Sequence, residues 1–298
     1  MPASPKYLDP ETIAAMRGLE LRAKAIVAGA ISGLHRSAYH GFSVEFAEHR
    51  QYAPGDDIRY IDWRVFGRVD RFYIKEYEEE TNLKAYIILD ASKSMAFASD
   101  GVSKIEYAKY VAAALTHLVT SQQDAVALVL WDEKLRKFIP PGNNPLHQRD
   151  IYRTLSEAEP EGTTDVGGLL QELAERVRQR SLMIILSDLL DTSELSLMKA
   201  LRHLRHKGHD VIVFHVLDHA ELEFPFDRMT RFEGLEVSDH LLADPRALRE
   251  AYLAEMEGFC QSVKGACMAN QMDYVTLDTS RPLDVALSSY LAARAGTR

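Results

Sequence analysis

The chain has 298 residues and carries 44 Asp and Glu against 35 Lys and Arg, which gives a formal net charge of −9 at pH 7. This acidic balance argues against general nucleic-acid binding, because that activity requires a basic surface. A hydrophobic fraction of 46% is enough for a sizeable core, and 27% charged residues is ordinary for a soluble protein. The length allows one large domain or two small ones.

The cysteines and the first residues bear on the compartment. Cys260 and Cys267 would lie about 10 Å apart if both were on one helix, which is too far for a disulfide. The N-terminus lacks the positively charged start and apolar core of a signal peptide. No apolar run approaches the roughly 20 residues that a membrane helix needs. We therefore expect a cytoplasmic protein with reduced cysteines and no membrane insertion.

The first predicted element is a helix that begins at Asp9-Pro10-Glu11 and ends at Gly33. Its start combines a capping side chain, a proline in the first turn and an acid near the positive end of the helix. The following stretch mixes aromatic, charged and turn-forming residues, with short strands predicted at 43–52 and 72–79. We predict that residues 1–82 form a helix and a small β-rich appendage packed on the core, because its large apolar side chains would otherwise be exposed.

Strands and helices alternate from residue 83 onward. This alternation predicts an α/β fold with a doubly wound, mostly parallel sheet over residues 83–298. A turn at Asp132-Glu133 would make the third strand an antiparallel edge strand. The predicted strands are 86–89, 125–131, 135–139, 182–186, 211–216 and 274–277. The predicted helices are 104–120, 146–156, 166–180, 194–207, 245–270 and 282–293.

Residues 85–95 read AYIILDASKSM, the most informative run in the chain. An apolar stretch this short, followed by turn residues, is typical of a buried parallel strand. Ligands of open α/β sheets bind just beyond the carboxyl ends of such strands. Asp90, Ser92 and Ser94 would therefore offer a carboxylate and two hydroxyls at the rim of a site. These are hard oxygen ligands, which Mg²⁺ prefers.

Two later loops supply further oxygen ligands. Thr163 and Thr164 precede the helix predicted at residue 166, and Asp188 follows a second apolar run, 182–186. Taken singly, each of these polar residues is a common turn or helix cap. The ordered set of Asp-x-Ser-x-Ser, threonine and strand-end aspartate is more specific than its parts.

This ordered set resembles the metal-ion-dependent adhesion site of the von Willebrand factor A domain. The resemblance implies that a divalent metal, Mg²⁺ or else Mn²⁺ or Ca²⁺, is held by Asp90, Ser92, Ser94, Thr164 and Asp188. Thr163 remains an alternative to Thr164. In that family one coordination position is left for an Asp or Glu carboxylate of a partner protein, and most members bind rather than catalyse.

Other segments resemble the bacterial domain of unknown function 58 family over nearly the whole chain. They are EFAEHRQYAPGDDIRYIDW at residues 45–63, in which Pro54 to Trp63 is highly specific, and YIKEYEEE at 73–80. GLHRS at 33–37, FPFD at 224–227 and DYVTLDTSRPL at 273–283 also fit. Members of that family are typically encoded beside MoxR-type AAA+ ATPases. The resemblance therefore implies a short cytosolic form that acts with such an ATPase in maturing or remodelling protein complexes.

The sequence thus predicts a non-enzymatic, Mg²⁺-dependent protein-binding module. A metal-dependent hydrolase and a degenerate scaffold without metal are the alternatives, although no general base stands near the predicted ligands. Lys93 lies between the two serines, and its ammonium would compete with a metal if it folded inward. Asp191 is a weaker rival to Asp188 as the last ligand. His203, His206 and His209 are interpreted as a basic helix end rather than a metal cluster, and His215 as a satisfied core residue.

Overall fold

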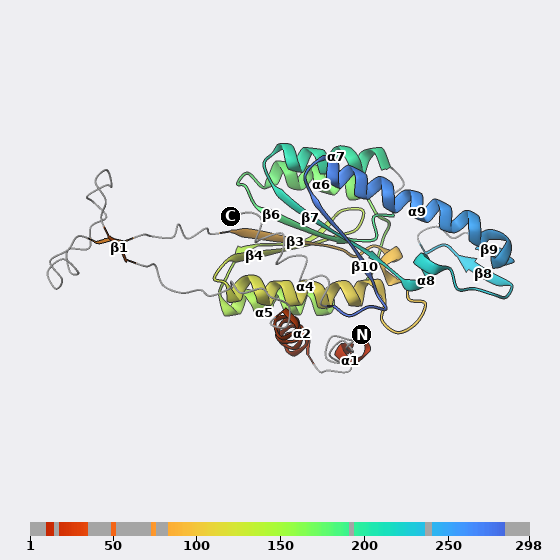
Figure 1. Ribbon diagram of the computed structural model, residues 1–298, viewed down its shortest axis with the longest axis horizontal. Helices are drawn as coiled ribbons and strands as arrows, with labels where there is room; N and C mark the ends of the chain where they lie inside the picture. The colour runs from red at the N-terminus through yellow and green to blue at the C-terminus, as the bar shows by residue number, and fades with distance from the viewer. Residues whose placement is uncertain are drawn as a thin grey trace. The chain divides into compact units, whose positions relative to one another are not determined.

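A six-stranded sheet forms the centre of the computed structural model (Figure 1), and five of its strands are parallel. The sixth, at one edge, pairs antiparallel with its neighbour and contains Pro140 and Pro141. The chain winds outward in both directions from the middle of the sheet. The predicted doubly wound, mostly parallel α/β fold is therefore confirmed. The strand order is β10 (Asp273–Asp278), β7 (Asp210–Leu217), β6 (Leu182–Ser187), β3 (Lys84–Asp90), β4 (Ala125–Trp131) and β5 (Leu135–Gly142).

Helices cover both faces of the sheet (Figure 1). One face carries α2 (Leu19–Leu34), α4 (Lys104–Ser121) and α5 (Pro145–Glu157), and the other carries α6 (Val166–Arg176), α7 (Glu194–His206) and α9 (Pro245–Ala269). Strand β3 shows why two cores form. Its side chains point alternately to opposite faces. Ile87 and Leu89 pack with α4, whereas Tyr86 and Ile88 pack with α6 and α7.

The structure describes residues 10–14, 18–34, 49–51, 73–75, 83–190, 194–235 and 240–283. The chain divides into two units, one made of residues 1–37 and 83–298 and the other of residues 38–82. The sequence analysis divided the chain at residue 82 and grouped the N-terminal helix with the appendage, whereas the structure groups that helix with residues 83–298. Arg22 of α2 donates to the hydroxyl of Tyr110 on α4 at 3.1 Å, and Ile26 is fully buried. These contacts place α2 with the α/β unit.

The N-terminal segment otherwise follows the prediction in part. The helix expected from residue 9 to Gly33 is broken into α1 (Pro10–Ala14) and α2, and Gly18 before α2 has a φ of +84°. Strands β1 (His49–Gln51) and β2 (Tyr73–Lys75) pair antiparallel inside the two predicted strands. Most of the 33–80 segment and of the helix predicted at 282–293 lies outside the described residues, so the predicted packing of the appendage stays a prediction.

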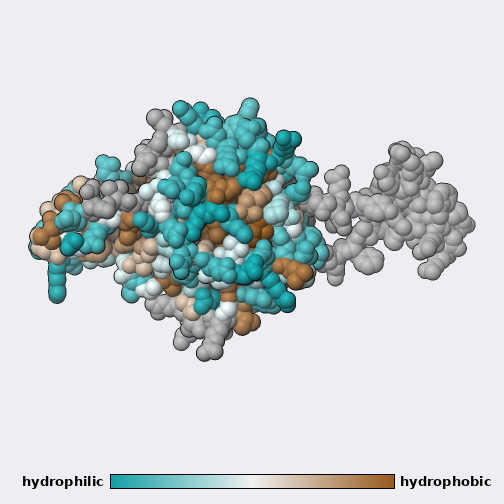
Figure 2. Space-filling view, turned by 180° about the vertical axis from the view of Figure 1, so that it is seen from behind, coloured by the Kyte–Doolittle hydropathy of each residue, from teal (hydrophilic) through white to brown (hydrophobic). Residues whose placement is uncertain are grey.

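An arm that the sequence analysis did not predict follows β7. It consists of α8 (His219–Glu223), β8 (Thr230–Glu233) and β9 (His240–Ala243), and it leads into α9. Its aromatic centre brings Phe224 against Phe226, Phe232 and Tyr252, with ring centroids 4.5 to 5.6 Å apart. Apolar side chains are exposed in the arm at Met229, Leu235, Leu241 and Leu242, and at Leu248 in the first turn of α9. Figure 2 shows hydrophobic surface at this end of the molecule.

The helices bear on two expectations, one about the cysteines and one about membrane spans. Cys260 and Cys267 both lie on α9 and are free thiols, as their spacing predicts. Among the helices that the structure describes, none has the length and apolar character that crossing a membrane requires.

Candidate functional site

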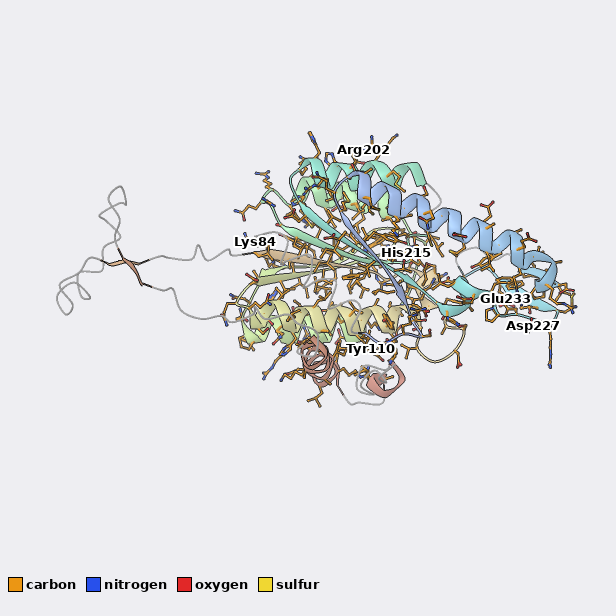
Figure 3. All side chains as sticks on the ribbon, in the orientation of Figure 1. Lys84, Tyr110, Arg202, His215, Asp227 and Glu233 are labelled. Atoms are coloured by element: carbon orange, nitrogen blue, oxygen red, sulfur yellow. The ribbon has the colours of Figure 1, made fainter. Side chains whose placement is uncertain are left out.

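The candidate site lies at the ends of the adjacent strands β3 and β6. Here the strand order reverses, because β4 follows on one side of β3 and β6 lies on the other. Asp90 is the last residue of β3 and Asp188 directly follows β6. Because the two strands are parallel neighbours, their carboxyl ends meet at one edge. Figure 3 shows Lys84, at the start of β3, on the far side of the sheet from the arm residues Asp227 and Glu233. The carboxyl edge therefore faces the arm, and it is the edge at which such folds bind ligands.

Asp90 is fully buried and accepts hydrogen bonds from neutral donors. The backbone N–H of Ser92 donates to its Oδ1 at 2.9 Å, and the hydroxyl of Ser187 donates to its Oδ2 at 2.6 Å. Burial and the nearby charge of Asp188 raise the pKa of Asp90 from its ordinary 3.8 to about 7, although these hydrogen bonds oppose the shift. Asp90 is thus a buried carboxyl group whose ionisation is unfavourable without a nearby cation.

Ser92 and Ser94 bring their hydroxyls together. Ser92 is fully buried, Ser94 is 8% exposed, and their Oγ atoms lie 3.0 Å apart. The short helix η3 (Lys93–Ala96) causes this approach, because one tight turn returns the second serine to the first. Lys93 between them is exposed to solvent, so its side chain is not folded inward toward the serines.

Thr164 reaches the same edge through backbone hydrogen bonds between two loops. The N–H of Lys93 donates to the carbonyl of Gly162 at 3.2 Å, and the N–H of Glu161 donates to the carbonyl of Ala91 at 2.8 Å. Thr164 is 6% exposed, whereas Thr163 is exposed, which favours Thr164 as the predicted ligand. The next residue, Asp165, caps α6 by accepting from Gly168 N–H at 2.8 Å.

Asp188 is held by a cation that the sequence analysis missed. The ammonium of Lys104, in the first turn of α4, lies 2.8 Å from Asp188 Oδ2 and 2.7 Å from Glu221 Oε1 on α8. The side chains of Lys104 and Asp188 are 1% and 0% exposed. Burial alone would lower the pKa of Lys104, but the two carboxylates outweigh it and raise the pKa. Burial raises the pKa of Glu221, although Lys104 opposes that shift.

The backbone around Asp188 is fixed by its neighbours. Leu189 is buried with a φ of +55°, a left-handed conformation that is strained for a bulky residue. It allows the N–H of Leu190 to donate to Asp188 Oδ1 at 3.2 Å. His215 on β7, inside the α/β unit (Figure 3), donates from Nε2 to the carbonyl of Asp188 at 2.8 Å and accepts from the hydroxyl of Tyr274 at 2.7 Å. It is the satisfied core histidine that was predicted.

Every parallel strand of the sheet ends in an aspartate or is directly followed by one, a pattern that the sequence analysis noted at two strands alone. Each accepts a hydrogen bond from the backbone N–H two residues later, as turn aspartates do. All of these aspartates therefore act as turn residues. Asp90 and Asp188 differ from the others because their charges lie close enough to interact, and because Ser92 of the serine pair donates to Asp90. The five are Asp90, Asp132, Asp188, Asp218 and Asp278.

The donor set fits a small divalent cation in its chemistry and its charge. Carboxylate and hydroxyl oxygens are the ligands that Mg²⁺ prefers. Asp90, Asp188 and the partly buried Glu221 supply three neighbouring carboxylates, against the single ammonium of Lys104. A divalent cation would balance the excess negative charge. Within the described residues, no group of three or more His, Cys, Asp or Glu forms a metal site, so the hydroxyls are essential to this candidate.

The remaining candidates are not joined to this edge. Asp191 lies outside the described residues. His203 contacts Glu175 at 3.0 Å at the end of α7, whereas His209 lies beyond the helix end and is fully buried. These histidines therefore form no shared site, as predicted.

Comparison with known proteins identifies relatives without an assigned activity. A family model described as "Protein of unknown function DUF58" matches residues 48–258. The uncharacterized protein Rv1480 of Mycobacterium tuberculosis is 29% identical over 220 residues, which cover 73% of this chain and 68% of the relative. The uncharacterized protein Mb1516 of Mycobacterium bovis matches with the same values.

Solved structures show weaker similarity. The conserved hypothetical protein BatB from Bacteroides thetaiotaomicron has a TM-score of 0.48 and 15% identity, over 72% of this chain and 97% of that one. The VWA domain of SpRpn10 has a TM-score of 0.42 and 11% identity, over 69% of this chain and 93% of that one.

Proposed function

This chain belongs to the DUF58 family, whose function is unknown, and we propose from its own site that it is a non-enzymatic protein-binding module. Its binding of a partner would depend on Mg²⁺. The observation that carries the proposal is the pairing of the Ser92 and Ser94 hydroxyls beside the buried carboxyl of Asp90, whose neighbouring strand leads to the buried Asp188 at the same edge of the sheet. Two buried carboxylates side by side are unfavourable unless cations offset them; Lys104 offsets Asp188, and a divalent cation would offset Asp90 as well.

Each residue of the site has a defined part in this function. Ser92, Ser94 and Thr164 supply neutral oxygens, and Asp90 and Asp188 supply charge. A bound Mg²⁺ would provide a hard coordination position that selects a carboxylate oxygen of the partner over an amide or thiol. Hydrogen bonds from Ser187 to Asp90 and from His215 to the Asp188 carbonyl hold the aspartates in place without adding charge.

The surroundings of the site favour binding over hydrolysis. Catalysis with an activated water requires a group that accepts a proton within hydrogen-bond reach. The titratable groups beside Asp188 within the described residues are Asp90, which the proposal assigns to the metal, and Lys104 and His215. Lys104 is kept protonated by two carboxylates, and His215 uses both ring nitrogens in hydrogen bonds. Neither serves as a base for a metal-bound substrate.

The partner that we propose is a MoxR-type AAA+ ATPase or its client in the cytoplasm, presenting an essential Asp or Glu. Support comes from the family resemblance, whose members are encoded beside such ATPases, and from the preference of a hard cation for carboxylate. By linkage, the partner must tighten Mg²⁺ binding by the same factor by which Mg²⁺ tightens partner binding.

The test is calorimetry with Mg²⁺, followed by pull-down of the purified ATPase with and without EDTA. We expect Mg²⁺ binding to raise stability by about 2.7 kcal/mol at a hundredfold excess over the dissociation constant. Ser92→Ala with Ser94→Ala should remove both Mg²⁺ binding and partner recovery. Ser121→Ala with Ser156→Ala is the matched control, because these serines bond helix carbonyls instead.

Two outcomes would contradict the proposal. Absence of Mg²⁺ binding by the folded wild type would remove its basis. Equal partner recovery by the wild type, the site variant and the EDTA sample would show that the partner docks elsewhere.

A further inference from the structure

Lys104 is the one buried ammonium that contacts the candidate site among the described residues. An isolated charge in a protein interior is strongly unfavourable, so a buried lysine needs partners. Lys104 has two, Asp188 at 2.8 Å and Glu221 at 2.7 Å, which come from opposite sides: the end of β6 and helix α8. The same ammonium therefore satisfies a predicted metal ligand and a residue of the arm.

We infer that Lys104 is a resident cation that competes with a divalent metal for Asp188, and that Glu221 limits this competition by holding the ammonium when the metal binds. This inference rests on the proposed Mg²⁺ site. Its physical basis is that Asp188 Oδ2, the oxygen in contact with Lys104, is also an oxygen that a cation at the site would attract. Two positive charges sharing one carboxylate repel each other unless a second carboxylate separates them.

Glu221 is placed to act as that second carboxylate. Its Oε1 faces Lys104, while its Oε2 accepts from the backbone N–H of Asp218 at 2.8 Å. The side chain of Asp218 in turn accepts from Ala220 N–H at 2.8 Å and from Ser99 N–H at 3.0 Å. Glu221 is thus fixed by a reciprocal capping box at the start of α8. It cannot follow Lys104 toward the metal without breaking the cap.

This geometry links the site to the arm. When Lys104 neutralises Asp188 it bridges β6 and α8, and when a metal takes over Asp188 the ammonium is left with Glu221 alone. Metal binding therefore changes the ion pairing between Lys104 and Glu221 of α8, the helix with which the arm begins. The residue that makes the connection, Lys104, is far from both partners in sequence.

The experiment measures Mg²⁺ affinity of the full chain by calorimetry in four proteins. Lys104→Gln removes the competing charge and should tighten Mg²⁺ binding by about tenfold or more, because the repulsion between two neighbouring cations is lost. Glu221→Gln leaves Lys104 to Asp188 alone and should weaken binding by about tenfold or more. Lys109→Gln is the matched control, because Lys109 is a buried lysine of the same helix paired with Glu106. It should leave the affinity unchanged.

Opposite shifts in the two site variants support the inference, since damage to the fold would weaken binding in both. Binding by the wild type with shifts of the same sign, or with no shift, overturns the inference and leaves the proposed function standing. Binding by Lys104→Gln but not by the wild type supports it, because the site is then blocked by its own lysine. Absence of binding in every protein overturns both ideas. If circular dichroism shows that Lys104→Gln is unfolded, Lys104→Met replaces it, and the inference is overturned unless that variant binds Mg²⁺ more tightly than the wild type.

Discussion

Replacing Asp90 with Asn should stabilise the metal-free protein, although the residue is fully buried. The donors to Asp90 are neutral, and Asp188 adds a negative charge nearby. A pKa of about 7 in place of 3.8 corresponds to about 4 kcal/mol against the ionised form at high pH. Asn keeps an oxygen that accepts from Ser92 N–H but weakens the hydrogen bond from Ser187. This loss reduces the gain in stability by about 1 kcal/mol. The expected net gain at pH 8 is about 3 kcal/mol.

The effect should depend on pH in a defined direction. The raised pKa belongs to the native state, so the native protein binds more protons than the unfolded chain between pH 3.8 and about 7. Stability of the wild type therefore falls as the pH rises through this window. Because Asn does not titrate, the advantage of Asp90→Asn should shrink from about 3 kcal/mol at pH 8 to below about 1 kcal/mol at pH 5.

Urea denaturation in EDTA at both pH values, followed by circular dichroism, measures this difference. Asp188→Asn is the informative comparison, because it removes a partner from the buried ammonium of Lys104 and should destabilise the protein by about 3 kcal/mol. Two aspartates with the same predicted role would then respond with opposite sign. The reasoning is refuted if Asp90→Asn is less stable than the wild type at pH 8, or if the gap does not change with pH.

Three further predictions concern packing, thiol chemistry and coupling. Gly258→Ala should stabilise α9 by about 1 kcal/mol, since nothing lies within 4 Å of the added methyl carbon. Gly167→Ala should destabilise the protein by about 1–3 kcal/mol, because its added carbon would lie 3.1 Å from a backbone carbon of α7. Urea denaturation of the two variants measures both changes. Burial raises the pKa of Cys267 to about 12, so iodoacetamide at pH 8 should label Cys260 first, and mass spectrometry that finds Cys267 labelled first would contradict this. Mg²⁺ should change hydrogen exchange in α8 of the wild type but not of Lys104→Gln, and equal changes in both would argue against coupling through the lysine.

The sequence predicts the sheet well, because its strands are short apolar runs that end in turn residues. It also predicts that Asp90 and Asp188 meet, since parallel strands bring their carboxyl ends to one edge. The paired hydroxyls of Ser92 and Ser94 follow from their spacing on a tight turn. These inferences need local pattern and topology alone.

Lys104 and the arm could not be predicted in the same way. Lys104 is separated from Asp188 by 84 positions, and a lysine in the first turn of a helix looks like a solvent-exposed residue. Its burial depends on how α4 and α8 pack around the end of β6. The arm strands, β8 and β9, read TRFE and HLLA, too short for a periodic signal. In both cases tertiary contacts decide the structure.

The prolines of β5 limit how this protein can associate. An edge strand normally offers a row of free N–H groups on which a strand of another molecule can assemble. Pro140 and Pro141 have no N–H to offer, and irregular pairing with β4 further distorts the edge. The sheet therefore resists growth into a continuous intermolecular sheet at this side. Copies of the chain crowded at high concentration should not join through β5.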